Sequence, residues 1–478
     1  MDGPVEEIYR RVRQGMSERG SARIAPAAAA VLWRERGGER EIYLVKRAPE
    51  LPFLGGFWSF PGGAVEAEDR RQKVPGAAGD EAASIAACAR ELCEETGVAI
   101  APSARGWSLA GRWLTPAFSP IRFDARYYVV ACPDGLEPDP ARSGGELCAG
   151  AWLSPAEALA SWRRGERLIP PPVLAVLRVL EGGFERLAER CAEAARAAGD
   201  EPRIWTIVPG VAAIPVRTPT LPPATHTNGY ALGEREVVIV DPGSPYREER
   251  EVLDRAVDAL IAGGARIAAV ALTHHHADHV GGADYLADRL GVPIWAHAET
   301  AARVGRVDRH LEDGERIVLQ GDPLREIEVV YTPGHAPGHL CFVDLETRFA
   351  VVGDMVASVG TIVVDPEEGD MRAYLDSLAR LRALDLRALL PAHGAPIPDV
   401  RPKLDGYVAH RLWRERKLEA VLTGDARPLG DLVKVVYDDV PPAIWTLAER
   451  SLLAHLLKLE REGRARRVGE DWRAPPGV

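Results

Sequence analysis

The chain has no apolar run that approaches the roughly 18 residues needed to cross a membrane as a helix. Its amino terminus, Met1-Asp2-Gly3-Pro4-Val5-Glu6-Glu7, is acidic and lacks the basic and then apolar layout of a signal peptide. Internal repeats and low-complexity segments are also missing, and the composition is that of an ordinary soluble globular protein. We therefore expect a cytoplasmic protein with no membrane partner. At 478 residues the chain is too long for one hydrophobic core, and about three domains are expected.

Cysteine is scarce, and negative charge exceeds positive charge. The six cysteines are scattered and form no Cys-x-x-Cys pair, which predicts reduced, mostly structural thiols. The net charge of −11 argues against a protein that coats nucleic acid. The segment from Arg401 onward is mildly basic, with 15 Lys and Arg against 12 Asp and Glu. This tail is compatible either with local nucleic-acid contact or with a solvated surface.

The most informative motif is the run Thr273-His274-His275-His276-Ala277-Asp278-His279, which follows the apolar stretch 267–272. Three further residues of ligand type each follow a predicted strand and precede a turn, and these are His335, Asp354 and His393. At strand ends such side chains can converge on one edge of a sheet. Imidazoles and carboxylates in this number suit a pair of divalent ions, provided that one carboxylate bridges them.

This pattern resembles the metallo-β-lactamase fold superfamily over nearly the whole of 204–398. The resemblance implies a first metal held by His274, His276 and His335, a second held by Asp278, His279 and His393, and Asp354 as the bridge. Zinc is the expected metal for an imidazole-rich site with few carboxylates. A hydroxide shared by the two ions would be the nucleophile, and Asp278 would orient it. The resemblance also makes Asp241 a residue that orders the ligand loops.

The remaining histidines carry weaker expectations. His275 alternates away from its neighbours on an extended segment and is expected outside the ligand set. His339 is expected to order a loop or to lie near the substrate. No partner motif accompanies His226, His297, His310, His410 or His455.

The tail is predicted to hold helices near 403–421, 429–437 and 446–462, followed by a small hairpin over 463–473. It resembles the winged helix of the β-lactamase-like endoribonuclease family, whose members include enzymes that act on single-stranded RNA. Arg464, Arg466 and Arg467 would lie on the wing and could contact phosphates. Alternatively, the tail only lines the metal cleft and shapes access for a small ester or thioester.

A second strong motif lies near the amino terminus, in Arg90-Glu91-Leu92-Cys93-Glu94-Glu95-Thr96-Gly97. On a helix the three glutamates share one face, where they repel unless a hard cation binds them, and Arg90 can brace the set. The segment is similar to the second half of the Nudix box, and Phe60-Pro61-Gly62-Gly63 resembles its glycine start. The resemblance, over about 23–163, implies a diphosphatase that uses Mg²⁺ or Mn²⁺ on nucleoside diphosphate derivatives. Glu91, Glu94 and Glu95 would be the ligands, with Glu94 also a catalytic candidate.

The box departs from the standard spacing. Five residues separate Gly63 from Asp69, as in the standard box, but Arg90 follows only after about 13 inserted residues. Counting backward from Arg90 places the expected glutamate at Ala82. The insertion resembles the coenzyme A diphosphatase branch, in which Glu146 is a further candidate ligand or base. This domain is therefore predicted to be a diphosphatase, a nucleotide-sensing module or a relic.

These observations predict a multidomain α/β hydrolase with three folded parts. Residues 1–22 form a lead-in helix, 23–165 a Nudix α/β/α sandwich, 166–202 a helical linker, 203–400 a metallo-β-lactamase αββα sandwich, and 401–478 a winged helix. The zinc site is expected to hydrolyse either a phosphodiester of single-stranded RNA or a small ester or thioester.

Overall fold

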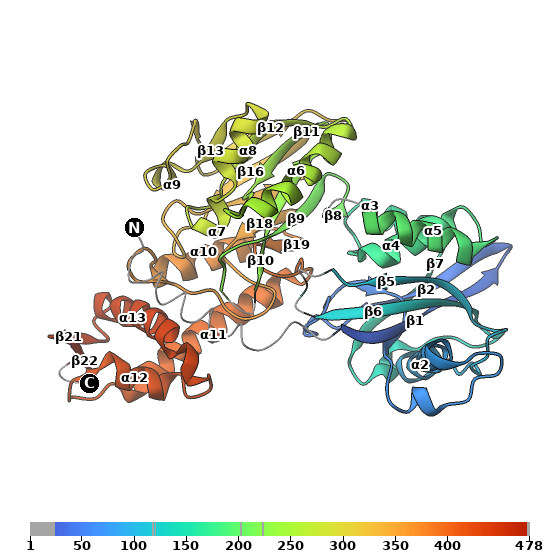
Figure 1. Ribbon diagram of the computed structural model, residues 1–478. Helices are drawn as coiled ribbons and strands as arrows, with labels where there is room; N and C mark the ends of the chain where they lie inside the picture. Colours follow the sequence, from blue (N-terminus) through green and yellow to red (C-terminus); the bar gives the residue numbers. More distant parts are fainter. Residues whose placement is uncertain (1–23, 117–118, 120, 201–202, 222–223, 476–478) are drawn as a thin grey trace. The chain divides into compact units, whose positions relative to one another are not determined.

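The computed structural model describes residues 24–116, 119, 121–200, 203–221 and 224–475 (Figure 1). The lead-in helix expected over 1–22 lies outside the described residues. The chain falls into two compact units that divide between Ala213 and Ile214, within strand β9 (Val211–Arg217). The division comes later than the domain boundary expected between residues 202 and 203. One reason is that β8 (Trp205–Val208) is joined to the first unit through the Trp162 indole, which donates to the Ile207 carbonyl at 2.6 Å.

The first unit is built on a seven-stranded mixed sheet in which β1 pairs with β6 in parallel and with β2 in antiparallel fashion. Its strands are β1 (Ile24–Arg36), β2 (Glu39–Arg47), β3 (Trp58–Ser59), β4 (Gly62–Ala64), β5 (Ser108–Leu114), β6 (Arg122–Ala131) and β7 (Leu147–Leu153). Helix α2 (Gly79–Thr96) covers one face, and the other face carries α3 (Pro155–Arg163), α4 (Pro171–Glu181) and α5 (Leu187–Asp200) (Figure 1). The expected α/β/α sandwich is confirmed.

Helix α2 is the element that positions the first candidate site. Ile85, Cys88 and Leu92 lie on one stripe of the helix, are fully buried and pack against the sheet. Asp80 and Glu81 in the first turn favour the positive end of the helix dipole. The helix ends at Gly97, whose φ of 75° places it in the left-handed conformation typical of a helix C-terminus. The remaining face therefore presents the acidic side chains of the last turns.

The second unit is built on two stacked sheets, and the first of them also includes β8 and the start of β9. The first has the order β14-β13-β12-β11-β10-β9-β8, and the second has the order β15-β16-β17-β18-β19. The remaining strands of the first sheet are β10 (His226–Gly233), β11 (Glu236–Val240), β12 (Arg266–Ala271), β13 (Ile294–Ala296) and β14 (Arg309–His310). Those of the second are β15 (Arg316–Leu319), β16 (Arg325–Tyr331), β17 (Leu340–Asp344), β18 (Phe349–Gly353) and β19 (Ala388–Pro391).

Helices cover the outer faces of these sheets. Helices α6 (Arg247–Ala262) and α8 (Ala283–Leu290) pack against β12, and α10 (Met371–Ala383) buries Tyr374, Leu378 and Leu381 against the second sheet. Two short helices, α7 (Ala277–Val280) and α9 (Ala298–Ala301), lie in the loops. The two sheets meet at β10 and β19, where the Tyr230 hydroxyl donates to the Pro391 carbonyl at 2.7 Å. This is the predicted αββα sandwich.

The tail forms three helices and a small sheet, as predicted: α11 (Val400–Val421), α12 (Leu429–Val436) and α13 (Trp445–Arg461), with β21 (Arg466–Val468) paired to β22 (Asp471–Arg473). A third strand that the sequence did not predict, β20 (Arg427–Pro428), pairs with β22. Short 3-10 turns occur at Asp69–Arg71, Pro140–Ser143 and Pro442–Ile444.

Helix α11 contributes to two hydrophobic cores. Leu404 and Tyr407, in its first half, pack in the core of the second sheet and α10. Leu418 and Leu422, at its end, pack in the core of the winged helix around Trp472. The Tyr407 hydroxyl also accepts from the Ala357 amide at 2.8 Å. The tail is therefore continuous with the sandwich.

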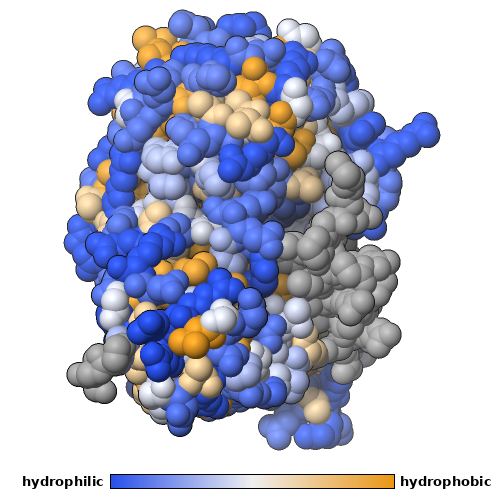
Figure 2. All heavy atoms as spheres, turned by 90° about the vertical axis from the view of Figure 1, so that its left-hand side faces the viewer, coloured by the Kyte–Doolittle hydropathy of each residue, from blue (hydrophilic) through white to orange (hydrophobic). Residues whose placement is uncertain are grey.

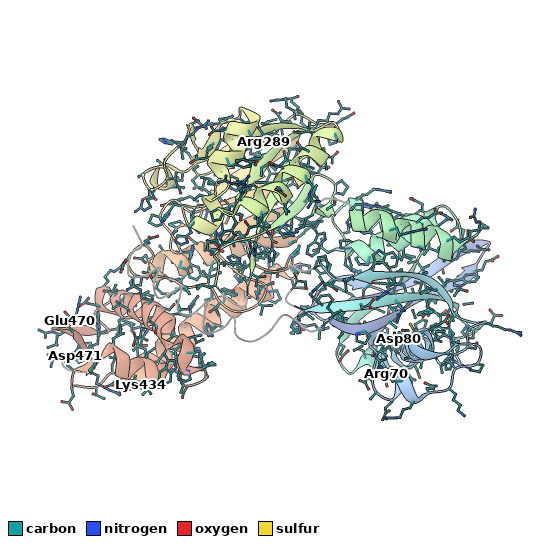
Figure 3. All side chains as sticks on the ribbon, in the orientation of Figure 1. Arg70, Asp80, Arg289, Lys434, Glu470 and Asp471 are labelled. Carbon is teal, nitrogen blue, oxygen red and sulfur yellow. The ribbon has the colours of Figure 1, made fainter. Side chains whose placement is uncertain are left out.

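The surface of the second unit is mostly polar. On the face shown in Figure 2, apolar side chains among the described residues form several separate groups rather than one broad patch. Figure 3 shows Lys434, Glu470 and Asp471 on the outside of the winged helix, so charges of both signs lie there. No described helix combines the length and apolarity required for a membrane span.

Candidate functional site

All seven predicted ligands of the second unit come together at one edge of its two sheets. His274, His276, Asp278 and His279 follow β12 of the first sheet. The others follow strands of the second sheet: His335 after β16, Asp354 after β18 and His393 after β19. Strands run extended and buried up to this edge, so only the polar residues after each strand can turn toward one another.

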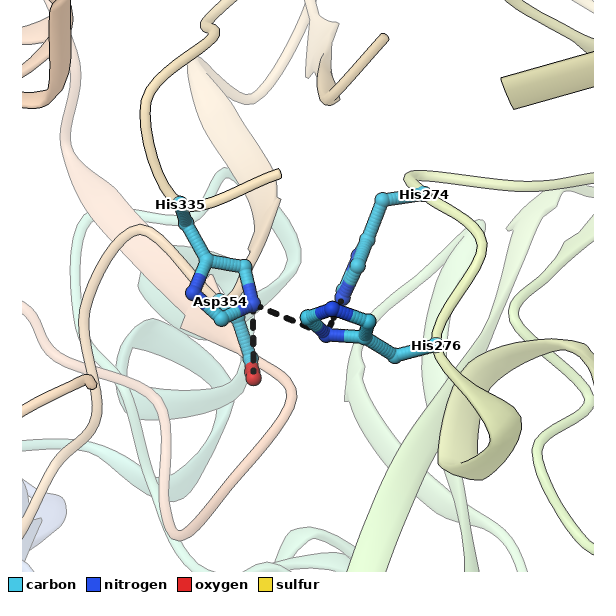
Figure 4. Close-up of side chains that lie close together, drawn as sticks. All are labelled: His274, His276, His335 and Asp354. Carbon is cyan, nitrogen blue, oxygen red and sulfur yellow. Dashed lines mark hydrogen bonds and ion pairs between the residues drawn. The ribbon is translucent and has the colours of Figure 1, made fainter. Parts of the chain in front are cut away.

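The first ligand set brings three imidazoles and one carboxylate together (Figure 4). His276 Nδ1 lies 2.9 Å from His274 Nε2 and 3.1 Å from His335 Nε2. His335 Nε2 lies 3.6 Å from Asp354 Oδ2. Four donor atoms therefore surround one point.

The second ligand set consists of Asp278, His279 and His393. Asp278 Oδ2 is 3.8 Å from His279 Nε2 and 3.5 Å from His393 Nε2. The other oxygen of Asp354, Oδ1, lies 3.6 Å from His279 Nε2 and 3.3 Å from His393 Nε2. Asp354 thus presents one oxygen to each set, which is the geometry that a bridging carboxylate needs.

Two buried atoms of this cluster have no hydrogen-bond partner among the described residues. They are His279 Nε2 and Asp354 Oδ1. Buried polar atoms without partners are costly, and a divalent ion between them would satisfy both. The donor set therefore fits a pair of metal ions, with imidazoles in the majority as zinc favours.

The histidines of the two sets differ in electrostatic surroundings. Burial, reinforced by the neighbouring imidazoles, holds the pKa of His274 well below its usual value, and burial together with His276 lowers the pKa of His335 to about 4. These rings are neutral at pH 7 and are ready to act as ligands. Burial also opposes the charged form of His279, but Asp278 and Asp241 outweigh it and raise its pKa. His279 therefore has more carboxylates close to its ring than His274 or His335 has.

Asp241 lies directly behind the ligand loop, at the end of β11. Its carboxylate accepts from the Thr273 amide at 2.8 Å and from the His279 Nδ1–H at 2.8 Å. Thr273 Oγ1 donates to the same carboxylate at 2.6 Å. The backbone of Asp241 has a φ of +48°, which is uncommon for a residue with a side chain. The geometry is that of a residue that fixes the orientation of a ligand histidine.

The structure adds a residue that the sequence did not reveal, Glu368. Its Oε2 accepts from His275 Nε2–H at 2.8 Å and from His276 Nε2–H at 3.2 Å. Glu368 lies in a loop without periodic structure, 92 positions from His276, so no spacing signal could have pointed to it. His339 lies beneath the cluster, where its Nε2 accepts from the Asp354 amide at 3.3 Å.

In the first unit, the acidic face of α2 is organised by Arg90. Its Nη1 donates to Glu91 at 3.0 Å and to Glu94 at 2.9 Å, as the sequence predicts. Its Nε and Nη2 donate to Asp69 at 3.1 and 3.0 Å. Asp69 is 2 % exposed. Asp69, at the box position counted forward from Gly63, therefore reaches Arg90, whereas Ala82 holds the position counted backward; the inserted residues loop out between Asp69 and α2.

The other two glutamates of this face differ in exposure. The Glu94 side chain is 58 % exposed, whereas Glu95 is buried and accepts from the Gly62 amide at 2.9 Å. Burial is the largest cause that raises the pKa of Glu95 to about 8. Burial also raises the pKa of Glu91. A Cβ on Gly63 would lie 2.3 Å from Glu91 Oε1, so only glycine allows this carboxylate to approach the loop.

The wing arginines are largely paired with carboxylates. Arg464 donates to Glu415 and Glu462 at 2.8 Å each and to Glu419 at 2.6 and 2.8 Å. Arg467 donates to the Gly469 carbonyl at 3.1 Å and to Glu470 at 3.3 Å. Arg466 is exposed on β21. Much of the positive charge expected on the wing is therefore compensated within the chain.

Comparisons with known proteins identify the domains that carry the two clusters. Family models match the metallo-beta-lactamase superfamily over residues 222–393, a beta-lactamase associated winged helix domain over 429–472, and a NUDIX domain over 23–171. The chain is similar to the lactamase-like protein adaB of Aspergillus niger, with 30% identity over 51% of this chain and 77% of that one. It is also similar to the beta-lactamase-like protein 2 homolog of Caenorhabditis elegans, with 29% identity over 50% and 79% of the two chains.

A further relative is the atrochrysone carboxyl ACP thioesterase AacuM of Aspergillus aculeatus, with 30% identity over 45% of this chain and 66% of that one. Among solved structures, a beta-lactamase domain protein from Burkholderia ambifaria shares the fold, with a TM-score of 0.50, 22% identity, and coverage of 57% of this chain and 93% of that one. The chain belongs to the metallo-β-lactamase superfamily, and it joins a metal-dependent hydrolase domain of that superfamily to a Nudix domain and a β-lactamase-associated winged helix.

Proposed function

We propose that the cluster around Asp354 binds two zinc ions and hydrolyses a small ester or thioester. The observation that carries this proposal is the position of Asp354, which offers one oxygen to each of two donor sets. Bound zinc ions would supply a nucleophilic hydroxide at neutral pH and would stabilise the negative charge that develops on the carbonyl oxygen. The remaining chemistry falls to the side chains that the chain itself provides.

Asp278 is the group we assign to orienting the nucleophile and holding its proton. Its Oδ2 accepts from Thr227 Oγ1 at 3.2 Å, and Thr227 in turn contacts Thr218 Oγ1 at 2.8 Å. These hydroxyls restrain the carboxylate, so its free lone pairs face the cluster. Asp241 holds His279, and the Val363 carbonyl accepts from His335 Nδ1–H at 2.9 Å, so ligands of both sets have fixed rings.

The choice of an ester or thioester over RNA rests on charge. RNA binding depends on cations that can replace counterions along the phosphates. Arg464 and Arg467 already face carboxylates of this chain. A thioesterase among the relatives also supports thioester chemistry. Cleavage of single-stranded RNA is therefore the alternative that the assay must exclude.

The test is a substrate panel on the zinc-loaded full chain, with aryl esters, acyl thioesters and single-stranded RNA oligonucleotides. Asp278→Asn should lower kcat for the ester or thioester by about 10²-fold or more. Asp284→Asn, on the exposed side of α8, is the matched control and should leave kcat unchanged. Rapid RNA cleavage without ester or thioester turnover would overturn the assignment.

We propose a second activity for the Nudix domain, Mg²⁺- or Mn²⁺-dependent cleavage of coenzyme A or another nucleoside diphosphate derivative. The observation that favours it is the Asp69–Arg90 pair, which keeps Arg90 between Glu91 and Glu94 despite the insertion. Glu91, Glu94 and Glu95 would hold the ion. Glu95, with its pKa of about 8, would lose its proton when the cation binds.

Glu94→Gln combined with Glu95→Gln should abolish diphosphate release and leave ester or thioester turnover intact. Glu81→Gln, an exposed glutamate in the first turn of the same helix, is the control. Calorimetry on the wild-type chain with a nucleotide then distinguishes a catalytic domain from a nucleotide-sensing one. Nucleotide binding without turnover would replace the catalytic assignment by a sensing one.

A further inference from the structure

One loop connects the metal cluster with the winged helix. It spans residues 359–370, between β18 and α10, and is called here the connecting loop. Two backbone hydrogen bonds hold the end of this loop. The Gly369 amide donates to the Asp365 carbonyl within the loop at 2.6 Å, and the Asp370 amide donates to the Gly334 carbonyl beside the cluster at 2.9 Å. Gly334 immediately precedes the candidate ligand His335.

On the side of the cluster, this loop contacts two histidines of the first ligand set. The Val363 carbonyl accepts from His335 Nδ1–H at 2.9 Å, and the Glu368 carboxylate accepts from His276 Nε2–H at 3.2 Å. In each ring, one nitrogen binds the loop and the other nitrogen faces the other candidate ligands. The loop binds His335 Nδ1 and His276 Nε2, whereas His335 Nε2 and His276 Nδ1 face the cluster. Each contact therefore fixes the tautomer and leaves the inward nitrogen with a free lone pair.

On the other side, the loop is held by arginines of the winged helix. Arg450 on α13 donates to Asp365 at 2.9 and 2.6 Å and lies 2.7 Å from Glu367. Arg461, on the same helix, donates to Asp370, and the buried Arg411 on α11 donates to the Ile362 carbonyl. A two-point guanidinium–carboxylate pair restrains direction as well as distance. The position of Glu368 thus depends on residues that belong to the tail.

We infer that Glu368 is a positioning residue for the first metal ion, and that Arg450 of the winged helix sets its position through the connecting loop. The inference rests on the proposed two-metal site. The Glu368 side chain is 41 % exposed, so it has no rigid packing of its own and relies on Arg450 for its placement. The winged helix then has a part in metal retention that is separate from any contact with substrate.

The test compares Glu368→Ala and Glu368→Gln with the wild-type full chain, by titration of Zn²⁺ and Co²⁺ against a chelating indicator. Glu368→Ala should weaken the binding of one of the two ions by about 10- to 100-fold and leave the other unchanged. Glu368→Gln retains an acceptor for His276 and should fall between the alanine variant and wild type. Asp376→Asn, on the exposed side of α10, is the control and should bind both ions normally.

The second arm of the test is Arg450→Ala, which leaves every candidate ligand and Glu368 in place. It should weaken the same ion and alter the Co²⁺ absorption spectrum in the same direction, while Arg450→Lys restores part of the loss. A wild-type chain that takes up two ions, with Glu368→Ala and Arg450→Ala indistinguishable from it, would overturn this inference alone. A wild-type chain that takes up fewer than two ions would overturn the two-metal proposal and this inference with it.

Discussion

The buried Asp69 and the partly exposed Arg90 form a two-point ion pair across 21 positions of the chain, with Arg90 Nε 3.1 Å from Oδ1 and Nη2 3.0 Å from Oδ2. The same guanidinium then reaches Glu91 and Glu94. A buried carboxylate thus orients a cation that in turn orients two candidate metal ligands. The hydrogen bond to Asp69 is the largest cause that raises the pKa of Arg90, so the arginine stays charged.

Asp69→Asn should disable the Nudix site without unfolding it. Loss of the negative charge frees Arg90 to move onto Glu91 and Glu94, where it competes with a cation. We expect Mn²⁺ affinity to fall by about 10- to 100-fold. Electron paramagnetic resonance of free Mn²⁺ measures this directly. Glu68→Gln, at a side chain that is 79 % exposed, is the control and should bind Mn²⁺ like wild type. Equal affinity in all three chains would contradict the role of Asp69.

Gly334→Ala should displace His335. Gly334 has a φ of +126°, and a Cβ there would lie 2.2 Å from the backbone nitrogen of Tyr374. Either α10 or the His335 loop must shift, at a cost on the order of 1–3 kcal/mol or more. We expect a lower melting temperature and weaker zinc binding together.

Gly406→Ala is the control variant, because nothing lies within 4 Å of its Cβ position in α11. It should stabilise the chain by about 0.5–1 kcal/mol. Unchanged zinc affinity in Gly334→Ala would show that the loop tolerates a side chain.

Removal of metal should destabilise the second unit selectively. Four candidate ligands follow β12 of one sheet and three follow strands of the other, so bound ions link the two sheets. A chelator should lower the melting temperature of this unit, since an ion that binds only the folded state stabilises it. Calorimetry should show one transition that moves with zinc concentration and one that does not. If no unfolding transition changes its temperature with zinc concentration, the proposed metal site of the second unit is contradicted.

Glu415→Gln should destabilise the winged helix at neutral pH by about 1–3 kcal/mol, because it removes one of the two carboxylates that hold the buried Lys458 and leaves only Glu462. Burial opposes the charged form of Glu415, but the neighbouring His455, 3.5 Å away, and the hydrogen bonds from Lys458 outweigh it and lower its pKa to about 2. A depressed carboxyl pKa contributes stability that is present above the unfolded value of about 4.3 and is lost as the pH falls toward 2. Melting temperatures of the two chains should therefore differ at pH 7 and converge below pH 3. A melting-temperature difference that stays the same from pH 7 to below pH 3 would rule out ionised Glu415 as the source of the stability.

The sequence predicted the parts of this molecule that follow from local patterns. Strand β12 and the strands before His335 and Asp354, which are β16 and β18, follow from local sequence patterns, and helix α2 was expected around the three glutamates that share one face. The seven ligands were predicted as a set because their residue types and positions after strands are themselves local signals. The structure brings all seven together.

Other features depend on contacts between distant segments and were not predictable in this way. Glu368 becomes a partner of His276 only through the path of a loop that has no period. Asp69 contacts Arg90, although the spacing counted back from Arg90 leads to Ala82. The inserted residues loop out, so they lengthen the sequence between Asp69 and Arg90 without separating the two side chains. The compensation of Arg464 arises from carboxylates more than 40 positions away.

The two cores shared by α11 bear on how this architecture can be rearranged. A cut before Val400 would strip Leu404 and Tyr407 from the sandwich and leave the apolar face of α10 in water. The β-lactamase-like sandwich and its winged helix would therefore have to be transferred between genes together. Further domains could be fused outside this pair. Attempts to express the sandwich without its tail should yield aggregates, and a tail expressed alone should begin after Tyr407.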